Sequence, residues 1–319
     1  MAGLNIPLTV PKGKRSQYLK NWRVATKKTG HLLLFAGDQK VEHLNDDFFG
    51  RGIAPDDAAP EHLFKIASLG EIGVFATQLG LIARYGASYK NIPYLVKLNG
   101  KTNIFEERDR LLSRAWLKVA QVLEFKEQSR LNIVGVGYTV YLGGEAETKM
   151  LREAATMVYE AHQAGLLAII WIYPRSKTIK NEDDIHLIAG AAGVAATLGA
   201  DFVKVKYPYK NKNIEKTTKD FKEATLAAGR TQVICVGGTK QSVSDLLKNS
   251  YLQIKNSGTA GMALGRNLHQ RPLEEAVRLT HALSAIIYRG KTDKEALKIY
   301  NTPIKLKNKN SKFLNFFSF

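Results

Sequence analysis

The sequence has one cysteine, Cys235, which lies inside an apolar run, and it has no apolar stretch approaching the ~20 residues of a membrane-spanning helix. A single cysteine excludes a disulfide framework and a thiolate metal cluster. The first residues also lack the apolar core of a signal peptide. We therefore expect a soluble protein of the reducing cytoplasm with no membrane partner.

Acidic residues are few: 29 Asp and Glu face 47 Lys and Arg, which gives a formal net charge of +18. Such a charge favours anionic partners. The basic residues are spread along the chain, however, and no zinc-finger spacing or aromatic–basic recognition motif is present. We expect no specific nucleic-acid partner, and phosphorylated metabolites are the smaller anions that this surface suits.

Histidines are also scarce, with seven in 319 residues. Most of them fall in stretches with helical or loop patterns, whereas a metal-dependent site needs several at one place. Only His43 and His269 lie near the ends of apolar runs, and we interpret them as ordinary polar residues or substrate contacts. The sequence predicts no metal site.

Short apolar runs alternate with longer amphipathic stretches along most of the chain. The runs cover residues 31–38, 73–79, 94–99, 132–141, 167–173, 202–207, 232–237 and 261–265. Eight strands that alternate with helices require right-handed crossovers and a parallel sheet. This order predicts an α/β protein with a single-domain (β/α)₈ TIM barrel.

We place the barrel domain at residues 31–290, between a basic N-terminal arm (1–30) and a basic, aromatic C-terminal tail (291–319). An insertion at about 43–60, rich in Asp, Gly and Pro, should form a loop over one end of the barrel. Disorder is expected for the basic part of the tail, and its phenylalanines could dock on a neighbour.

The run that ends in Phe202-Val203-Lys204-Val205-Lys206 reads as a buried strand with both lysines on one face. Burial and a neighbouring ammonium favour the uncharged amine, which attacks carbonyls to form imines. Lys204 is our candidate nucleophile. Lys206 could take that role instead or could lower the pKa of its neighbour, and both lysines could merely extend from the strand end into solvent.

Active sites of such barrels lie at the carboxyl ends of the strands. Other predicted strands also end in polar residues that could act together with Lys204. Asp38 could pair with the lysine, orient a substrate hydroxyl or cap a helix. Tyr173 shares a strand face with Trp171 and Arg175, and a phenol near a cation can move protons, although it could also be an ordinary amphipathic tyrosine. Lys97, at the third strand, is a further substrate contact.

Two glycine-containing segments follow the last two strands. They are Gly237-Gly238 and Gly265-Arg266. Barrels of this kind often bind phosphate on these loops. Backbone amides at the three glycines and the guanidinium of Arg266 would hold the phosphate.

Together these segments resemble the archaeal-type class I fructose-bisphosphate aldolases, the DhnA-like family, over about residues 30–290. The carriers are residues 37–43 (GDQKVEH), 97–102 (KLNGKT), 171–175 (WIYPR), 199–204 (GADFVK), 237–238 and 265–270 (GRNLHQ). The resemblance implies a metal-free reversible cleavage of fructose 1,6-bisphosphate, with a covalent Schiff base on Lys204 and no other cofactor. It makes Tyr173 the general acid/base, Asp38 the first-strand carboxylate and Trp171 a positioning residue.

The resemblance also implies a homo-oligomer acting in glycolysis or gluconeogenesis. Two departures concern the substrate ends: Gln39-Lys40 stands where many relatives have His-Gly, and Ser176 stands where they have Gly. The alternatives are a related Schiff-base lyase or transaldolase on another sugar phosphate, including a step that requires coenzyme A, and a non-catalytic barrel that binds phosphate or nucleic acid.

Overall fold

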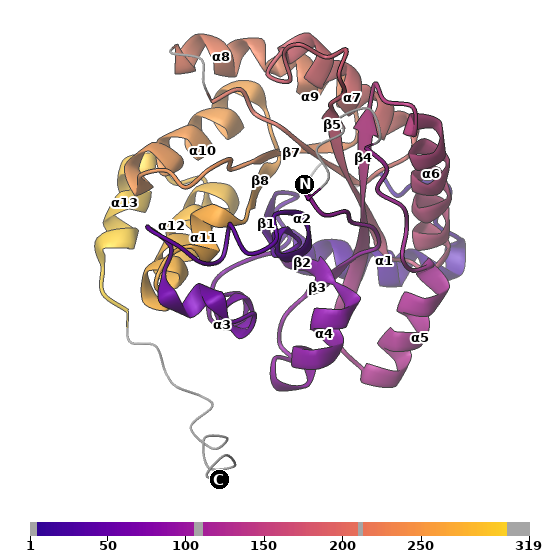
Figure 1. Ribbon diagram of the computed structural model, residues 1–319, viewed down its shortest axis with the longest axis horizontal. Helices are drawn as coiled ribbons and strands as arrows, with labels where there is room; N and C mark the ends of the chain where they lie inside the picture. Colours follow the sequence, from indigo (N-terminus) through magenta and orange to yellow (C-terminus); the bar gives the residue numbers. More distant parts are fainter. Residues whose placement is uncertain (1–4, 105–110, 210–212, 305–319) are drawn as a thin grey trace.

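The computed structural model describes residues 5–104, 111–209 and 213–304. Its eight strands form a closed parallel barrel in which each strand pairs with its neighbour in the chain and β8 pairs with β1 (Figure 1). The strands are β1 (Leu32–Ala36), β2 (Val74–Gln78), β3 (Tyr94–Lys97), β4 (Ile133–Leu142), β5 (Leu167–Pro174), β6 (Phe202–Val205), β7 (Gln232–Val236) and β8 (Gly261–Leu264). The predicted TIM barrel and all eight predicted strands are confirmed.

Helices surround the strands on the outside of the barrel (Figure 1). The α-helices of the described residues are α1 (Arg15–Ala25), α2 (Gln39–Glu42), α3 (Glu61–Leu69), α4 (Leu79–Tyr85), α5 (Val119–Ser129), α6 (Glu147–Gln163), α7 (Ile185–Thr197), α8 (Ile214–Asp220), α9 (Lys222–Ala228), α10 (Val243–Ser257), α11 (Arg266–His269), α12 (Leu273–Arg289) and α13 (Asp293–Asn301). Short 3₁₀ turns occupy Lys12–Lys14, Pro55–Ala58 and Gly86–Ser88. In the part of the chain that the structure describes, no helix has the length and hydrophobicity needed to cross a membrane.

Strand side chains divide into two buried layers, as alternation requires. One face packs under the helices, for example Val203 and Val205 of β6. The other face fills the barrel interior with residues such as Leu34, Ile169 and Trp171. The interior face continues past the apolar residues to the carboxyl ends of the strands, where it presents polar side chains to the mouth.

Helix α1 closes the opposite end of the barrel. Trp22 stacks on Phe202, the first residue of β6, with ring centroids 5.0 Å apart. The hydroxyl of buried Tyr18 donates to Asp201 Oδ1 at 2.5 Å, and His162 Nε2 lies 3.2 Å from the other oxygen of the same carboxylate. Part of the predicted arm is thus a helical plug.

The start of the predicted tail is helical, so the expectation of disorder is wrong for this part. Thr292 and Glu295 form a capping box that begins α13, and the Arg278 guanidinium of α12 lies 5.1 Å from the Tyr300 ring. The phenylalanines of the tail, Phe313, Phe316, Phe317 and Phe319, lie outside the described residues. The domain limits at residues 30 and 290 stay a prediction.

Candidate active site

Lys204 lies inside the barrel at the carboxyl end of β6, and only 5% of its surface is exposed. Its neighbour in register on β5 is Trp171, and its ammonium nitrogen lies 5.1 Å from the indole ring. Burial lowers the pKa of the Lys204 amine, with Lys97 and Arg266 contributing, while Asp38 and Glu42 oppose the shift. The environment therefore favours the neutral, nucleophilic form.

Lys97, at the end of β3, is the second cation in the mouth. Its side chain is fully buried, and Nζ lies 5.3 Å from the Trp171 ring. It is held by two carboxylates, 3.7 Å from Asp38 Oδ2 and 3.3 Å from Glu42 Oε1. The indole of Trp171 thus contacts both lysines. The charge of Lys97 lowers the pKa of Lys204, which is the effect that the sequence left open for Lys206.

Asp38 is buried, with 1% of its surface exposed, two residues beyond β1. It occupies the N-cap position of α2, but its side chain makes no capping hydrogen bond. Within the described residues Oδ2 has no hydrogen-bond partner at all, and Lys97 is its nearest cation. The helix-cap interpretation is therefore wrong, and Oδ2 keeps its hydrogen-bonding capacity for a ligand.

Tyr173 lies one pleat nearer the mouth than Trp171 on the same strand. It pairs in register with Tyr141 of β4, and the two rings stack with centroids 6.1 Å apart. Burial raises the pKa of Tyr173, and the charges of Glu42 and Asp38 raise it further. The phenol therefore carries its proton at neutral pH.

Arg175 and Lys206 form the rim beside Tyr173, and both are paired with acids. Arg175 makes a bidentate contact with Glu182, with Nε–Oε1 and Nη2–Oε2 distances of 2.9 Å. Lys206 Nζ lies 3.0 Å from Asp183 Oδ1 and 3.5 Å from Glu182 Oε2. These contacts hold Lys206 at the rim.

The loops after β7 and β8 lie together, as predicted for a phosphate site. Asn267 joins them, because its Nδ2 donates to the carbonyl of Gly237 at 3.0 Å and its Oδ1 accepts from the amide of Gln241 at 2.8 Å. Gly238 has φ +69°, which glycine adopts without strain. The amide of Gly237 donates to the Ala263 carbonyl, so the expectation that this amide faces a phosphate is wrong.

The other half of the phosphate site involves Gly265 and Arg266. A Cβ at Gly265 would lie 2.1 Å from the Gln39 amide nitrogen, so glycine is required for Gln39 to pack there. Arg266 Nε lies 3.7 Å from Asp47 Oδ2, in the predicted insertion loop. The pKa of Asp47 is lowered: burial acts against this change, but the neighbouring His43, Arg266 and His269 outweigh it. The insertion thus contacts the predicted phosphate loop, and the candidate anion ligand Arg266 remains partly exposed.

Four residues of the mouth were not predicted from the sequence: Glu42, Gln78, Tyr141 and Glu182. Glu42 lies on α2, four residues after Asp38, which is a spacing that places both on one helix face. Gln78 ends β2 beside Lys97, with 6% of its surface exposed and neither amide atom hydrogen-bonded in the described residues. Alternation along the predicted strands could have identified Gln78 and Tyr141, whereas nothing local identifies Glu182.

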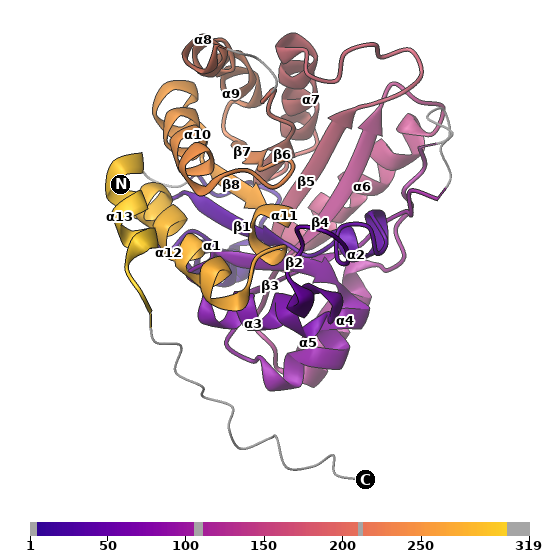
Figure 2. The same cartoon turned by 60° about the vertical axis from the view of Figure 1, so that its left-hand side comes forward.

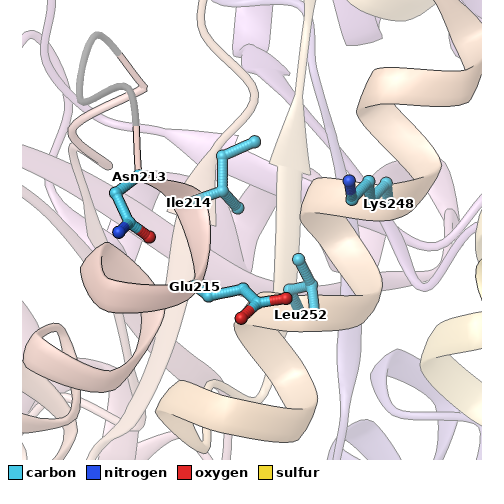
Figure 3. Close-up of a pocket in the computed structure, with 5 residues that line it drawn as sticks. All are labelled: Asn213, Ile214, Glu215, Lys248 and Leu252. Atoms are coloured by element: carbon cyan, nitrogen blue, oxygen red, sulfur yellow. The ribbon is translucent and has the colours of Figure 1, made fainter.

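The described residues also form cavities on the outer surface, away from the barrel mouth. One of about 380 Å³ lies between α8 and α10 and is lined by Asn213, Ile214, Glu215, Lys248 and Leu252 (Figure 3). It contains none of the predicted site residues. The described residues also contain no cluster of three or more His, Cys, Asp or Glu with the geometry of a metal site.

Comparisons with known proteins agree with this geometry. A family model described as DeoC/LacD family aldolase matches residues 32–271. A protein of Methanocaldococcus jannaschii named fructose-bisphosphate aldolase/6-deoxy-5-ketofructose 1-phosphate synthase is 57% identical over 93% of this chain and 94% of its own. The class 1 fructose-bisphosphate aldolase of Thermoproteus tenax is 30% identical over 85% of this chain and 95% of its own.

Solved structures give the same result. A fructose-bisphosphate aldolase from Slackia heliotrinireducens superposes with a TM-score of 0.90, at 46% identity over 95% of this chain and 96% of its own. An archaeal fructose-1,6-bisphosphate aldolase superposes with a TM-score of 0.72, at 29% identity over 85% of this chain and 99% of its own. That structure is described as having the catalytic Lys covalently bound to the carbinolamine intermediate of the substrate.

Proposed function

The chain belongs to the DeoC/LacD family of aldolases, and on this basis we propose that it reversibly cleaves fructose 1,6-bisphosphate into dihydroxyacetone phosphate and glyceraldehyde 3-phosphate. The reaction runs through a Schiff base on Lys204. The observation that carries the proposal is the buried Lys204, whose pKa is lowered at the barrel mouth. Its ammonium group lies close to the indole of Trp171, as does that of Lys97, which is bound by carboxylates. A lowered pKa favours the neutral amine, which is the form that attacks a ketone.

In this mechanism the neutral Lys204 amine attacks C2 of the ketose, and a proton moves from nitrogen to oxygen to give a carbinolamine. Tyr173 donates its phenolic proton to the departing hydroxyl, so water leaves and a protonated imine forms. The resulting phenolate accepts the proton of the C4 hydroxyl as the C3–C4 bond breaks, and the electron pair moves into the imine to give an enamine. Glyceraldehyde 3-phosphate leaves at this step.

The second half regenerates the enzyme. Tyr173 returns its proton to C3 of the enamine, which restores the protonated imine. Water then adds to C2 and gives a proton back to the Tyr173 phenolate, and the carbinolamine breaks down to dihydroxyacetone phosphate and the free Lys204 amine. The loops of Gly238, Gly265 and Arg266 would hold the C1 phosphate, while Asp38 Oδ2, which lacks a hydrogen bond, would accept one from a substrate hydroxyl. Trp171 keeps the imine carbon beside Tyr173 by fixing Lys204.

The test is reductive trapping. Borohydride with fructose 1,6-bisphosphate should add one reduced triose phosphate to the intact protein, and peptide mapping should place it on Lys204. Lys204→Met should abolish the adduct while retaining the fold. An adduct on Lys206 would move the nucleophile, and a fully active Lys204→Met variant would refute the mechanism.

A second candidate reaction follows from the M. jannaschii relative, whose name includes 6-deoxy-5-ketofructose 1-phosphate synthase. Cleavage of that sugar between C3 and C4 gives dihydroxyacetone phosphate and pyruvaldehyde, so the same enamine would add to an uncharged aldehyde. The pairing of Arg175 and Lys206 with Glu182 and Asp183 favours an uncharged acceptor. Mass spectrometry of a mixture of enzyme, fructose 1,6-bisphosphate and pyruvaldehyde would reveal the six-carbon monophosphate.

Cytoplasmic location, self-association and the direction of flux stay predictions. Light scattering after size-exclusion chromatography tests the predicted homo-oligomer.

A further inference from the structure

The loop between β5 and α7 carries two acids back onto the rim of the barrel mouth. Glu182 contacts the guanidinium of Arg175 through both carboxylate oxygens at 2.9 Å, and its Oε2 also lies 3.5 Å from Lys206 Nζ. Asp183 adds a contact of 3.0 Å to Lys206. The two cations of this rim are therefore balanced by two carboxylates.

The Arg175 guanidinium faces the site. Arg175 lies 5.8 Å from the ring of Tyr173 and 5.9 Å from the ring of Tyr141, and both rings belong to the mouth. β4 and β5 are longer than the other strands, and Figure 2 shows them extending past their neighbours. In the barrel order Arg175 follows β5, on one side of β6 and Lys204, whereas the loop of Gly265 and Arg266 follows β8, on the other side.

A ketose bisphosphate bound with its C1 phosphate on the β7–β8 loops would direct its other end toward the rim of Arg175 and Lys206. A bidentate carboxylate uses the guanidinium donors that a phosphate would use. The Glu182 pKa is low because Arg175 and Lys206 stabilise its charge, although burial opposes the shift. The carboxylate thus stays charged at neutral pH and competes with an incoming phosphate.

We propose that Glu182 is a specificity-determining residue that occupies the distal anion site formed by Arg175 and Lys206. A substrate with a C6 phosphate must displace Glu182, whereas a substrate or acceptor without that phosphate leaves the contact in place. The inference rests on the proposed function, since it assigns the C6 end of the ketose to this rim. Because Glu182 competes with the C6 phosphate, the enzyme is less selective for bisphosphates than Arg175 and Lys206 alone would make it.

The experiment compares kcat/KM for fructose 1,6-bisphosphate with kcat/KM for fructose 1-phosphate. Glu182→Gln keeps the shape and removes the charge, so the bisphosphate-to-monophosphate ratio should rise about tenfold, through a lower KM for the bisphosphate. Asp183→Asn removes one of the two acids that contact Lys206 and leaves the Arg175–Glu182 contact in place, so it should raise the ratio less. Glu223→Gln, whose partner is the exposed His186, is the matched control and should leave the ratio unchanged.

An unchanged ratio in Glu182→Gln would overturn the proposal. A lower ratio would also overturn it, because Glu182 would then act by orienting Arg175 for the phosphate. If the wild type cleaves neither sugar, the proposed function fails, and titration with inorganic phosphate decides the inference separately. Glu182→Gln should then bind phosphate about tenfold more tightly than wild type, and adding Arg175→Ala to that variant should remove the gain.

Discussion

Replacement of Lys97 by glutamine tests whether a second buried lysine keeps the Lys204 amine neutral. Lys97 lies between Asp38 and Glu42 on one side and the Trp171 ring on the other. In the variant these two carboxylates raise the pKa of Lys204 without opposition from the Lys97 charge. The amine should therefore be protonated over a wider pH range, and imine formation should fail at higher pH than in wild type.

The magnitude follows from the indole contacts. The two ammonium nitrogens lie 5.3 and 5.1 Å from the Trp171 ring, so they are at most about 10 Å apart. At an effective dielectric constant of about 20, two charges at that distance repel by about 1.7 kcal/mol. This energy corresponds to somewhat more than tenfold in acid dissociation. The acidic limb of the kcat/KM profile should move up by about one pH unit or more.

The assay measures this limb, together with the pH dependence of borohydride trapping on Lys204. Lys206→Gln is the control and should leave the limb in place, because Lys206 is bound to Glu182 and Asp183. Thermal unfolding accompanies both variants, since loss of Lys97 leaves buried carboxylates unpaired at a cost of about 3–5 kcal/mol. A limb that stays within 0.3 pH units, in a folded Lys97→Gln variant, would refute the electrostatic role.

Three further outcomes are expected. Lys204→Met should stabilise the protein by about 1–3 kcal/mol at pH 7 in urea unfolding, because it removes a desolvated amine. The pKa of Lys204 is lower in the folded than in the unfolded state, so this gain in unfolding free energy should be complete at low pH and vanish above pH ~10.5. Tyr173→Phe should lower kcat by about 100-fold or more in steady-state assays, and a smaller loss would remove Tyr173 as the proton donor. Tyr18→Phe should cost about 1–3 kcal/mol of unfolding free energy, because Asp201 Oδ1 loses its hydrogen bond, and should leave kcat unchanged. A matching loss of kcat would contradict a purely structural plug.

The strands could be predicted closely because each is a short apolar run bounded by glycine or polar residues. The alternation within β5 and β6 also predicted that Trp171, Tyr173 and Lys204 face the interior, and the structure places them there. This success reflects the period of two in strands, which needs no knowledge of distant residues. The helical tail segment also carries a local signal, the capping box of Thr292 and Glu295, which marks the start of a helix.

The acids of the mouth could not be predicted in the same way. Glu42 reaches Lys97 across 55 positions of the chain, and Glu182 reaches Lys206 across 24 positions. Such pairings depend on how loops fold over the barrel, and charged loop residues are usually solvated. The plug was missed for a similar reason: Tyr18 and Trp22 share a helix face at i, i+4 spacing, but their partners Asp201 and Phe202 are known only once the barrel closes.

The distribution of charge explains how a basic protein can favour the neutral form of a lysine in its site. The net charge of +18 attracts anions to the surface, but cations at the mouth are paired with acids: Lys97 with Asp38 and Glu42, and Arg175 with Glu182. Lys204 is the exception, since it has no carboxylate within ion-pair distance in the described residues. Because a close carboxylate would stabilise the ammonium form, the acids must bind Lys97 instead for Lys204 to remain a nucleophile. The division of carboxylates between two lysines on one indole is therefore the feature on which the proposed chemistry depends.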